Sequence, residues 1–207
     1  MDKKRKAGRP VGTVKPKEHL YLDEGQLRVF FNQIKKAGDE KYLLIFNLVL
    51  QYAMRVSELC LTRLDDISLG EKMTITIQGL KHGHKRTYGH VHPELAKQLR
   101  KWIQGRDDKN PYLFPSKSVD DNKPLNPQSV KNRFKRYIQA AGLSMKFSVH
   151  NLRASRAVQM VKDKKYGIME LARWMRIKSV QNAQQYFDRV SYEETENKLN
   201  KDFGVHF

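Results

Sequence analysis

The sequence predicts a mainly α-helical fold with a small antiparallel β-sheet. Most of the chain repeats apolar side chains with the spacing of helices that cover a core, whereas residues 73–78 alternate apolar and polar side chains as a half-buried strand does. Capping residues and turn formers separate these segments. Hydrophobic residues make up 39% of the 207 residues, which suffices for one core and leaves little room for a second domain.

Three helices are expected before the sheet. Asp23 is a candidate N-cap for the first, and Gly38 ends it. Its apolar residues recur at i, i+3, i+4 and i+7, namely Leu27, Phe30, Phe31 and Ile34. A second, more apolar helix covers residues 40–54, and a third begins near Val56.

Two strands and several further helices follow. Residues 73–78 and 86–92 are expected to pair as a hairpin, and Pro93 opens the next helix. Residues 105–127 are rich in turn formers and are expected to form a long surface connection. Later helices are expected at residues 128–141, 151–162, 167–175 and 180–189. Ser191 with Glu194 fits a capping box and predicts a separate last helix.

The chain is strongly basic, with 40 Lys and Arg against 22 Asp and Glu and a formal net charge of +18. Such a surplus indicates a polyanionic partner, and double-stranded DNA is the first candidate. No apolar run approaches the ~18 residues that span a bilayer, and no signal peptide precedes the core. We therefore expect a soluble, cytoplasmic protein with no membrane partner. The single cysteine, Cys60, lies between two leucines and is expected to pack in the core.

Residues 1–19 are expected to be a disordered basic arm before a folded domain of residues 20–207. Within the arm, residues 1–17 hold seven cations and one carboxylate, so they carry +6 and leave +12 of the total on the rest. The Gly-Arg-Pro at residues 8–10 resembles an AT-hook, which lies in a narrow A·T-rich minor groove. A plain basic arm is an equally good interpretation. The DNA-binding candidates in the arm are Lys3, Lys4, Arg5, Lys6 and Arg9.

Cleavage of a DNA phosphodiester without a metal needs a nucleophile, cations for the two non-bridging oxygens and an acid for the leaving oxygen. Arginine suits the second task because its charged, planar fork can bind a phosphate with two hydrogen bonds. Four sequence blocks supply such residues in order: YAMRVSELCLTRLDDI, LKHGHKR, HNLRASRA and NAQQYFDRVS. Together they resemble the catalytic domain of the tyrosine recombinases, of the phage-integrase type, over about residues 20–200.

The resemblance implies a set of catalytic residues and one supporting acid. The catalytic residues are Arg55, Lys81, His150, Arg153 and Tyr186, and the supporting acid is Glu58. Tyr186 would attack the phosphate to give a 3′-phosphotyrosyl link and a free 5′-hydroxyl, while Arg55 and Arg153 hold the phosphate oxygens. Lys81 would protonate the leaving oxygen, and His150 would assist proton transfer or phosphate binding. The resemblance implies no cofactor, since rejoining needs neither ATP nor a metal.

One position departs from the family pattern. The family usually has a histidine or tryptophan nine residues before the tyrosine, where it braces the scissile phosphate or donates a hydrogen bond to it, and this chain has Ile177 there. The adjacent cations Arg176 and Lys178 are candidate substitutes. Tyr192 is a competing nucleophile, but it lies beyond the predicted helix cap and misses the expected spacing.

The resemblance predicts a site-specific DNA recombinase, an integrase or invertase of a mobile genetic element. It implies a homotetramer on paired DNA sites and allows accessory DNA-bending proteins. Most members carry a DNA-clamping domain before the catalytic domain, and this chain resembles members with the catalytic domain alone. Two alternatives stay open. One is a non-catalytic DNA-binding protein derived from a recombinase, which Ile177 favours; the other is a type IB topoisomerase-like relaxing enzyme.

Overall fold

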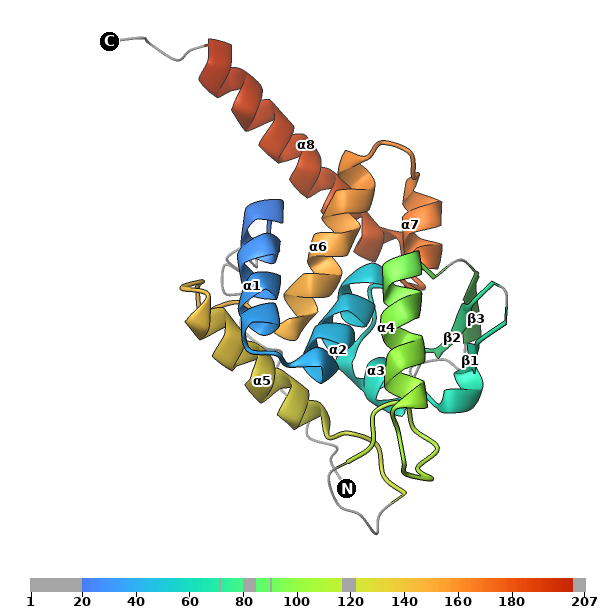
Figure 1. Cartoon of the computed structure of the whole chain (residues 1–207). Helices are drawn as coiled ribbons and strands as arrows, with labels where there is room; N and C mark the ends of the chain where they lie inside the picture. Colours follow the sequence, from blue (N-terminus) through green and yellow to red (C-terminus); the bar gives the residue numbers. More distant parts are fainter. Residues whose placement is uncertain (1–19, 71, 80–84, 90, 117–121, 203–207) are drawn as a thin grey trace, which may run out of the picture.

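A computed structural model describes residues 20–70, 72–79, 85–89, 91–116 and 122–202, and the side chains of these residues up to 197. Helices dominate this part of the chain, and a three-stranded antiparallel sheet accompanies them (Figure 1). The elements are α1 (Glu24–Lys36), α2 (Glu40–Gln51), α3 (Val56–Leu61), the 3₁₀ turn Leu64–Asp66, β1 (Ile67–Ser68), β2 (Thr74–Gln78), β3 (Lys85–Gly89), α4 (Pro93–Gln104), α5 (Pro127–Ala140), α6 (Val149–Lys162), α7 (Ile168–Trp174) and α8 (Val180–Asp202). The predicted fold class is confirmed.

The core is built around α2, which contacts α1, α4 and α6. Phe30 of α1, Phe46 of α2 and Phe134 of α5 are fully buried, and their ring centroids lie 5.0 to 5.6 Å apart. Aromatic pairs at such distances add about 0.5–1.5 kcal/mol each beyond the area they bury. Cys60 of α3 is also buried, as predicted, and burial raises the pKa of its thiol to about 12. This core holds α6, which carries two predicted site residues, against α2.

The helix ends explain where the site residues lie. Asp23 caps α1, as predicted, by accepting a hydrogen bond from the backbone N–H of Gln26 at 2.8 Å. The second helix ends at Gln51, three residues earlier than expected, because Ala53 adopts a left-handed conformation with φ 47°. This turn places Arg55 at the start of α3.

The sheet contains the predicted hairpin and one additional strand. In the hairpin, β2 and β3 are antiparallel, with Ile75 opposite Tyr88. The additional strand, β1, pairs with the other edge of β2, with Ile67 opposite Ile75. It has two residues, which is too short for an alternating pattern to reveal it.

The predicted break before a separate last helix is wrong, because α8 runs without interruption through Ser191. No glycine or proline lies between residues 189 and 194. An ion pair of 2.8 Å joins Arg189 to Glu193 one turn later, across the predicted break. Val190 is buried and ties the middle of the helix to the core. The C-terminal part of α8 extends away from the other helices (Figure 1).

Three residues before α1 join the helices that carry the site. The carbonyl of Leu20 accepts a hydrogen bond from Asn151 of α6, and the N–H of Leu22 donates to the hydroxyl of Ser155, also on α6, at 2.8 Å. Between them, the hydroxyl of Tyr21 donates to the carboxylate of Glu193 on α8, with oxygen distances of 2.7 and 2.9 Å. The start of the described chain therefore contacts both α6 and α8.

The connection between α4 and α5 is partly core and not wholly surface, contrary to expectation. Leu113 and Phe114 are fully buried within it. The indole N–H of Trp102 donates to the carbonyl of Leu113 at 2.8 Å, and Arg106 donates to the carbonyls of Asn110 and Tyr112, each at 2.7 Å. The many turn-forming residues around Leu113 and Phe114 therefore obscure, in the sequence, an apolar pair that packs in the core.

Candidate active site

Arg55 and Glu58 form the first part of the site, at the start of α3. The carboxylate of Glu58 accepts from the backbone N–H of Arg55 at 2.8 Å and from its guanidinium Nη1 at 2.7 Å. The Glu58 side chain is 0% exposed, whereas that of Arg55 is 34% exposed. Burial works to raise the pKa of Glu58, but Arg176 and Arg55 outweigh it and hold that pKa below its ordinary value. A buried, ionised carboxylate therefore orients an arginine that reaches solvent.

Arg153, on α6, is the second arginine and is only 2% exposed. Its Nη1 donates to the carbonyl of Ala53, and its Nη2 donates to the carbonyl of Met175 just after α7. Burial, assisted by the charges of Arg55 and Arg176, lowers its pKa to about 10, so the group stays charged at neutral pH. The guanidinium thus links the turn before α3 to the end of α7.

Tyr186, the predicted nucleophile, lies on α8 and is 7% exposed. It belongs to an apolar cluster with Val158 of α6 and Met175. Burial raises the pKa of the phenol, while the nearby charges of Arg153 and Arg55 act in the opposite direction. The structure therefore brings the phenol into the electrostatic reach of both arginines.

His150 and Arg55 line one cleft of about 310 Å³. Desolvation, together with the charges of Arg153 and Arg55, lowers the pKa of His150, which favours the neutral ring at pH 7. Lys131 of α5 lines the same cleft. Sequence reasoning missed this lysine, because one cation on an amphipathic helix is no signal of a site.

The two cations beside Ile177 differ in exposure and in their hydrogen bonds. The Arg176 side chain is 4% exposed, and its guanidinium donates to Glu58 at 2.8 Å and to the Ala53 carbonyl at 3.0 Å. Lys178 is exposed, and Ile177 is half-buried against the cluster that contains Tyr186. Arg176 is therefore bound to acceptors inside the protein, and the role of Lys178 stays a prediction.

Some predicted residues lie outside the described part of the chain. They are Lys81 and, in the arm, Lys3, Lys4, Arg5, Lys6 and Arg9. Their roles stay predictions, as does the AT-hook interpretation of residues 8–10. The described strands β2 and β3 lead into the connection that contains Lys81.

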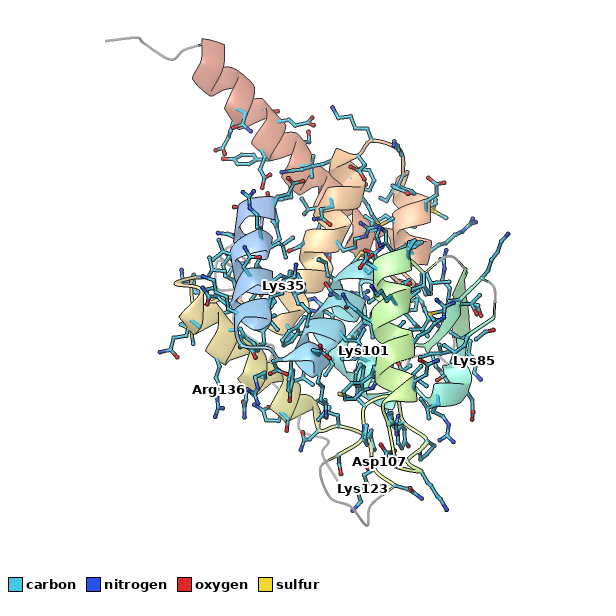
Figure 2. The ribbon with its side chains drawn as sticks, viewed as in Figure 1. Lys35, Lys85, Lys101, Asp107, Lys123 and Arg136 are labelled. Atoms are coloured by element: carbon cyan, nitrogen blue, oxygen red, sulfur yellow. The ribbon has the colours of Figure 1, made fainter. Side chains whose placement is uncertain are left out.

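Basic side chains are distributed over several elements of the described chain. Figure 2 labels examples on α1, β3, α4 and α5, namely Lys35, Lys85, Lys101 and Arg136. No helix in the described ranges combines the length and apolar character that a membrane span requires. Residues 18–207 carry +12 of the formal net charge of +18, so the positive excess is not confined to residues 1–17.

The helical fold thus brings a histidine and a buried tyrosine close to two arginines, and the comparison with known proteins shows which family has this arrangement. The chain matches the model of the Phage integrase family over residues 21–192 and belongs to that family. It is 34% identical over 140 residues to tyrosine recombinase XerA of Pyrococcus furiosus, a match that covers 68% of this chain and 47% of that protein. To XerA of Pyrococcus horikoshii it is 31% identical over 118 residues, covering 57% and 40%. The chain therefore spans about half the length of these relatives or less.

Solved structures share the fold at lower identity. A crystal structure of XerA recombinase has a TM-score of 0.71 with 21% identity, covering 86% of this chain and 65% of that one. A crystal structure of XerH site-specific recombinase, bound to palindromic difH substrate, has a TM-score of 0.72 with 20% identity, covering 88% and 53%. These similarities confirm the predicted catalytic-domain fold of the tyrosine recombinases.

Proposed function

We propose that this chain is a site-specific tyrosine recombinase that cleaves and rejoins DNA through a 3′-phosphotyrosyl intermediate. The observation that carries the proposal is the convergence of Arg55, Arg153 and Tyr186, which come from α3, α6 and α8. Membership of the phage integrase family supports it. Two fixed cations beside a tyrosine are what an attack on a phosphate anion requires.

In this reaction the phenolic oxygen of Tyr186 forms a bond to phosphorus while the bond from phosphorus to the 5′ oxygen breaks. The raised pKa of the phenol means that its proton must leave as the bond forms. His150, whose lowered pKa favours the neutral ring, is suited to assist that transfer. Arg55 and Arg153 stabilise the charge on the non-bridging oxygens, and Lys81 protonates the leaving 5′ oxygen. Attack by a 5′-hydroxyl on the phosphotyrosine reverses these steps and rejoins the strand.

The proposed partner is double-stranded DNA, and the proposed assembly is a homotetramer on paired sites. Among proteins with this fold, a lambda integrase tetramer has been solved bound to a Holliday junction, with a TM-score of 0.62 to this chain. Accessory DNA-bending proteins are part of the same proposal, since the sharp bending of DNA has an energetic cost that such proteins can offset.

A DNA substrate with a nick beside the cleavage site tests the proposal, because loss of the short fragment traps the covalent complex. We expect an adduct that survives SDS. Absence of any adduct would exclude the enzyme in favour of a non-catalytic DNA-binding protein. Recombinant products from two sites then distinguish recombination from topoisomerase-like relaxation, which would yield relaxed DNA alone.

Deletion of residues 1–17 should weaken DNA binding and flatten its dependence on salt without unfolding the domain. Seven cations are lost, and each phosphate contact removed reduces the magnitude of the negative slope of log affinity against log salt by about 0.9. Titrations at several salt concentrations measure this slope. Arg9→Ala separates the two interpretations of the arm, because an AT-hook loses affinity selectively on A·T-rich flanks and a plain arm loses it on all flanks. An unchanged slope after deletion would contradict both.

Ile177→His should raise the single-turnover cleavage rate. The isoleucine cannot donate a hydrogen bond to the phosphate, and one such donor contributes about 2.7–4 kcal/mol to a charged transition state. Adduct formation on the nicked substrate measures the effect, with Lys178→Ala as the paired variant. A severe loss in Lys178→Ala with a neutral Ile177→His would assign the role to Lys178. Neutral results for both variants would refute both accounts of this position.

A further inference from the structure

Two residues beside the candidate active site have a left-handed backbone conformation that residues other than glycine rarely adopt. Arg176 has φ 54° and Ala53 has φ 47°. Arg176 lies between α7 and α8, and Ala53 lies between α2 and α3. The two residues are in contact, because the guanidinium of Arg176 donates to the Ala53 carbonyl at 3.0 Å. Backbone strain of this kind persists where the surrounding structure maintains it, often at functional sites.

The Arg176 guanidinium donates hydrogen bonds to the turn between α2 and α3, to α3, to β3 and to α7. Its Nη2 donates to the Glu58 carboxylate at 2.8 Å as well as to Ala53. Its Nη1 donates to the carbonyl of Tyr52 at 3.2 Å, to the carbonyl of Trp174 at 3.1 Å and to the hydroxyl of Tyr88. These five acceptors inside the protein occupy both Nη groups of Arg176 and leave neither of them free to bind a phosphate, whereas each Nη of Arg153 makes one such hydrogen bond.

Arg176 shares one acceptor with each of the two proposed phosphate-binding arginines. The Glu58 carboxylate accepts from both Arg176 and Arg55. The Ala53 carbonyl accepts from both Arg176 and Arg153. A displacement of Arg176 would therefore disturb both Glu58, which holds Arg55, and the Ala53 carbonyl, which holds Arg153.

The same guanidinium reaches the sheet through Tyr88 of β3. The Tyr88 hydroxyl accepts from Arg176 and donates to the carbonyl of Trp174 at the end of α7. The rings of Tyr88 and Trp174 also pack edge to face, with centroids 4.9 Å apart. The hairpin that leads to Lys81 is thus joined to the α7–α8 turn at the point where Arg176 lies.

Arg176 thus forms a hydrogen-bonded bridge between the Glu58 carboxylate and the Ala53 carbonyl, and the charges at the site explain why this bridge suits it. Burial, and then the charges of Arg55 and Arg176, lower the pKa of Arg153, so the three guanidinium groups repel one another. Glu58 is the buried carboxylate that contacts two of them, and it is the one carboxylate among the buried residues of the described chain. The group keeps an excess of positive charge that a phosphate can neutralise, in a fixed arrangement.

We propose that Arg176 is a positioning residue for DNA strand cleavage: it orients Arg55 through Glu58 and Arg153 through the Ala53 carbonyl, without contacting DNA itself. The inference rests on the proposed function of the site. It also explains the arginine at a left-handed position, since glycine would fit that backbone but would leave three carbonyls, the Glu58 carboxylate and the Tyr88 hydroxyl without this donor.

Arg176→Gly is the informative variant, because it relaxes the backbone while it removes the bridge. We expect its cleavage rate on the nicked substrate to fall by about 10- to 100-fold, the range that small misplacements of catalytic groups produce. The dissociation constant for DNA should stay near that of the wild type. Millimolar guanidinium ion should restore part of the rate, because it can donate to the same acceptors, and it should leave the wild type unchanged. Rescue of this kind would not follow from a general loss of stability.

Two further variants complete the comparison. Arg173→Ala removes an exposed cation from α7, three residues away, and should cleave at the wild-type rate. Arg176→Lys keeps the charge without the planar fork and should cleave more slowly than the wild type. If the Arg176→Gly protein does not fold, the cleavage rate of Arg176→Lys tests the inference in its place. Wild-type cleavage by both Arg176 variants would overturn the inference.

A measurement without DNA separates this inference from the proposed function. Because Arg176 helps to hold the pKa of Glu58 down, NMR titration of the Glu58 carboxyl should give a higher pKa in Arg176→Lys or Arg176→Gly than in the wild type. If the wild type forms no DNA adduct, the proposed function fails, and this titration still decides whether the bridge exists. An unchanged Glu58 titration would overturn the bridge even in an active enzyme.

Discussion

Tyr186→Phe should abolish covalent attachment to DNA while leaving DNA affinity within a few-fold of the wild type. The change removes one hydroxyl, which is the proposed nucleophile, and little else. The ring is 7% exposed and packs in an apolar cluster, so phenylalanine should keep the fold. Gel analysis of SDS-resistant complexes on the nicked substrate measures attachment, and a binding titration on intact DNA measures affinity.

Tyr192→Phe is the matched control for that experiment. Tyr192 lies on the same helix, but it is 63% exposed and outside the buried cluster. Its replacement should leave the yield of adduct unchanged. An SDS-resistant adduct formed by the Tyr186→Phe protein would show that another residue is the nucleophile.

Arg153→Ala should reduce cleavage at least ~10²-fold, the usual effect of removing one fixed donor from a developing oxyanion. Part of the loss is structural, since the Met175 carbonyl loses its hydrogen bond from Arg153 and the Ala53 carbonyl keeps only the one from Arg176. Thermal unfolding should therefore be measured beside the single-turnover rate. The rate must be compared at a temperature at which both proteins are folded.

Arg153→Lys separates charge from geometry at the same position. A lysine keeps the charge but cannot bridge two carbonyls and a phosphate with a planar fork, so we expect little recovery of the rate. Near-normal cleavage by Arg153→Ala would contradict the role of this arginine in the proposed reaction.

Sequence reasoning predicted the regular elements best where periodicity was strong. The spacing of Leu27, Phe30 and Ile34 marked α1, and alternation marked β2, the first strand of the hairpin. It failed where a local signal competed with tertiary contacts. Ser191 and Glu194 resemble a cap, yet the contacts of Val190 and Glu193 keep α8 continuous.

The candidate site was only partly accessible from sequence. Motif order singled out Arg55, Arg153 and Tyr186, and the structure brings them together. Sequence does not reveal the direction of a side chain, so Arg176 and Lys178 looked equivalent beside Ile177. The inward path of Arg176 depends on a left-handed turn and on acceptors contributed by residues more than 80 positions away, such as Tyr88 and Glu58.

The attachment of residues 20–22 matters for anyone who shortens or labels this protein. A truncation that ends before Leu20 should spare the helices that carry the site. Cutting three residues further would strip hydrogen-bond partners from Asn151 and Ser155 on one helix and from Glu193 on another. A fluorophore or affinity tag joined at Tyr21 would lie beside α8, the helix that carries Tyr186. The usable boundary for protein engineering therefore lies on the N-terminal side of Leu20.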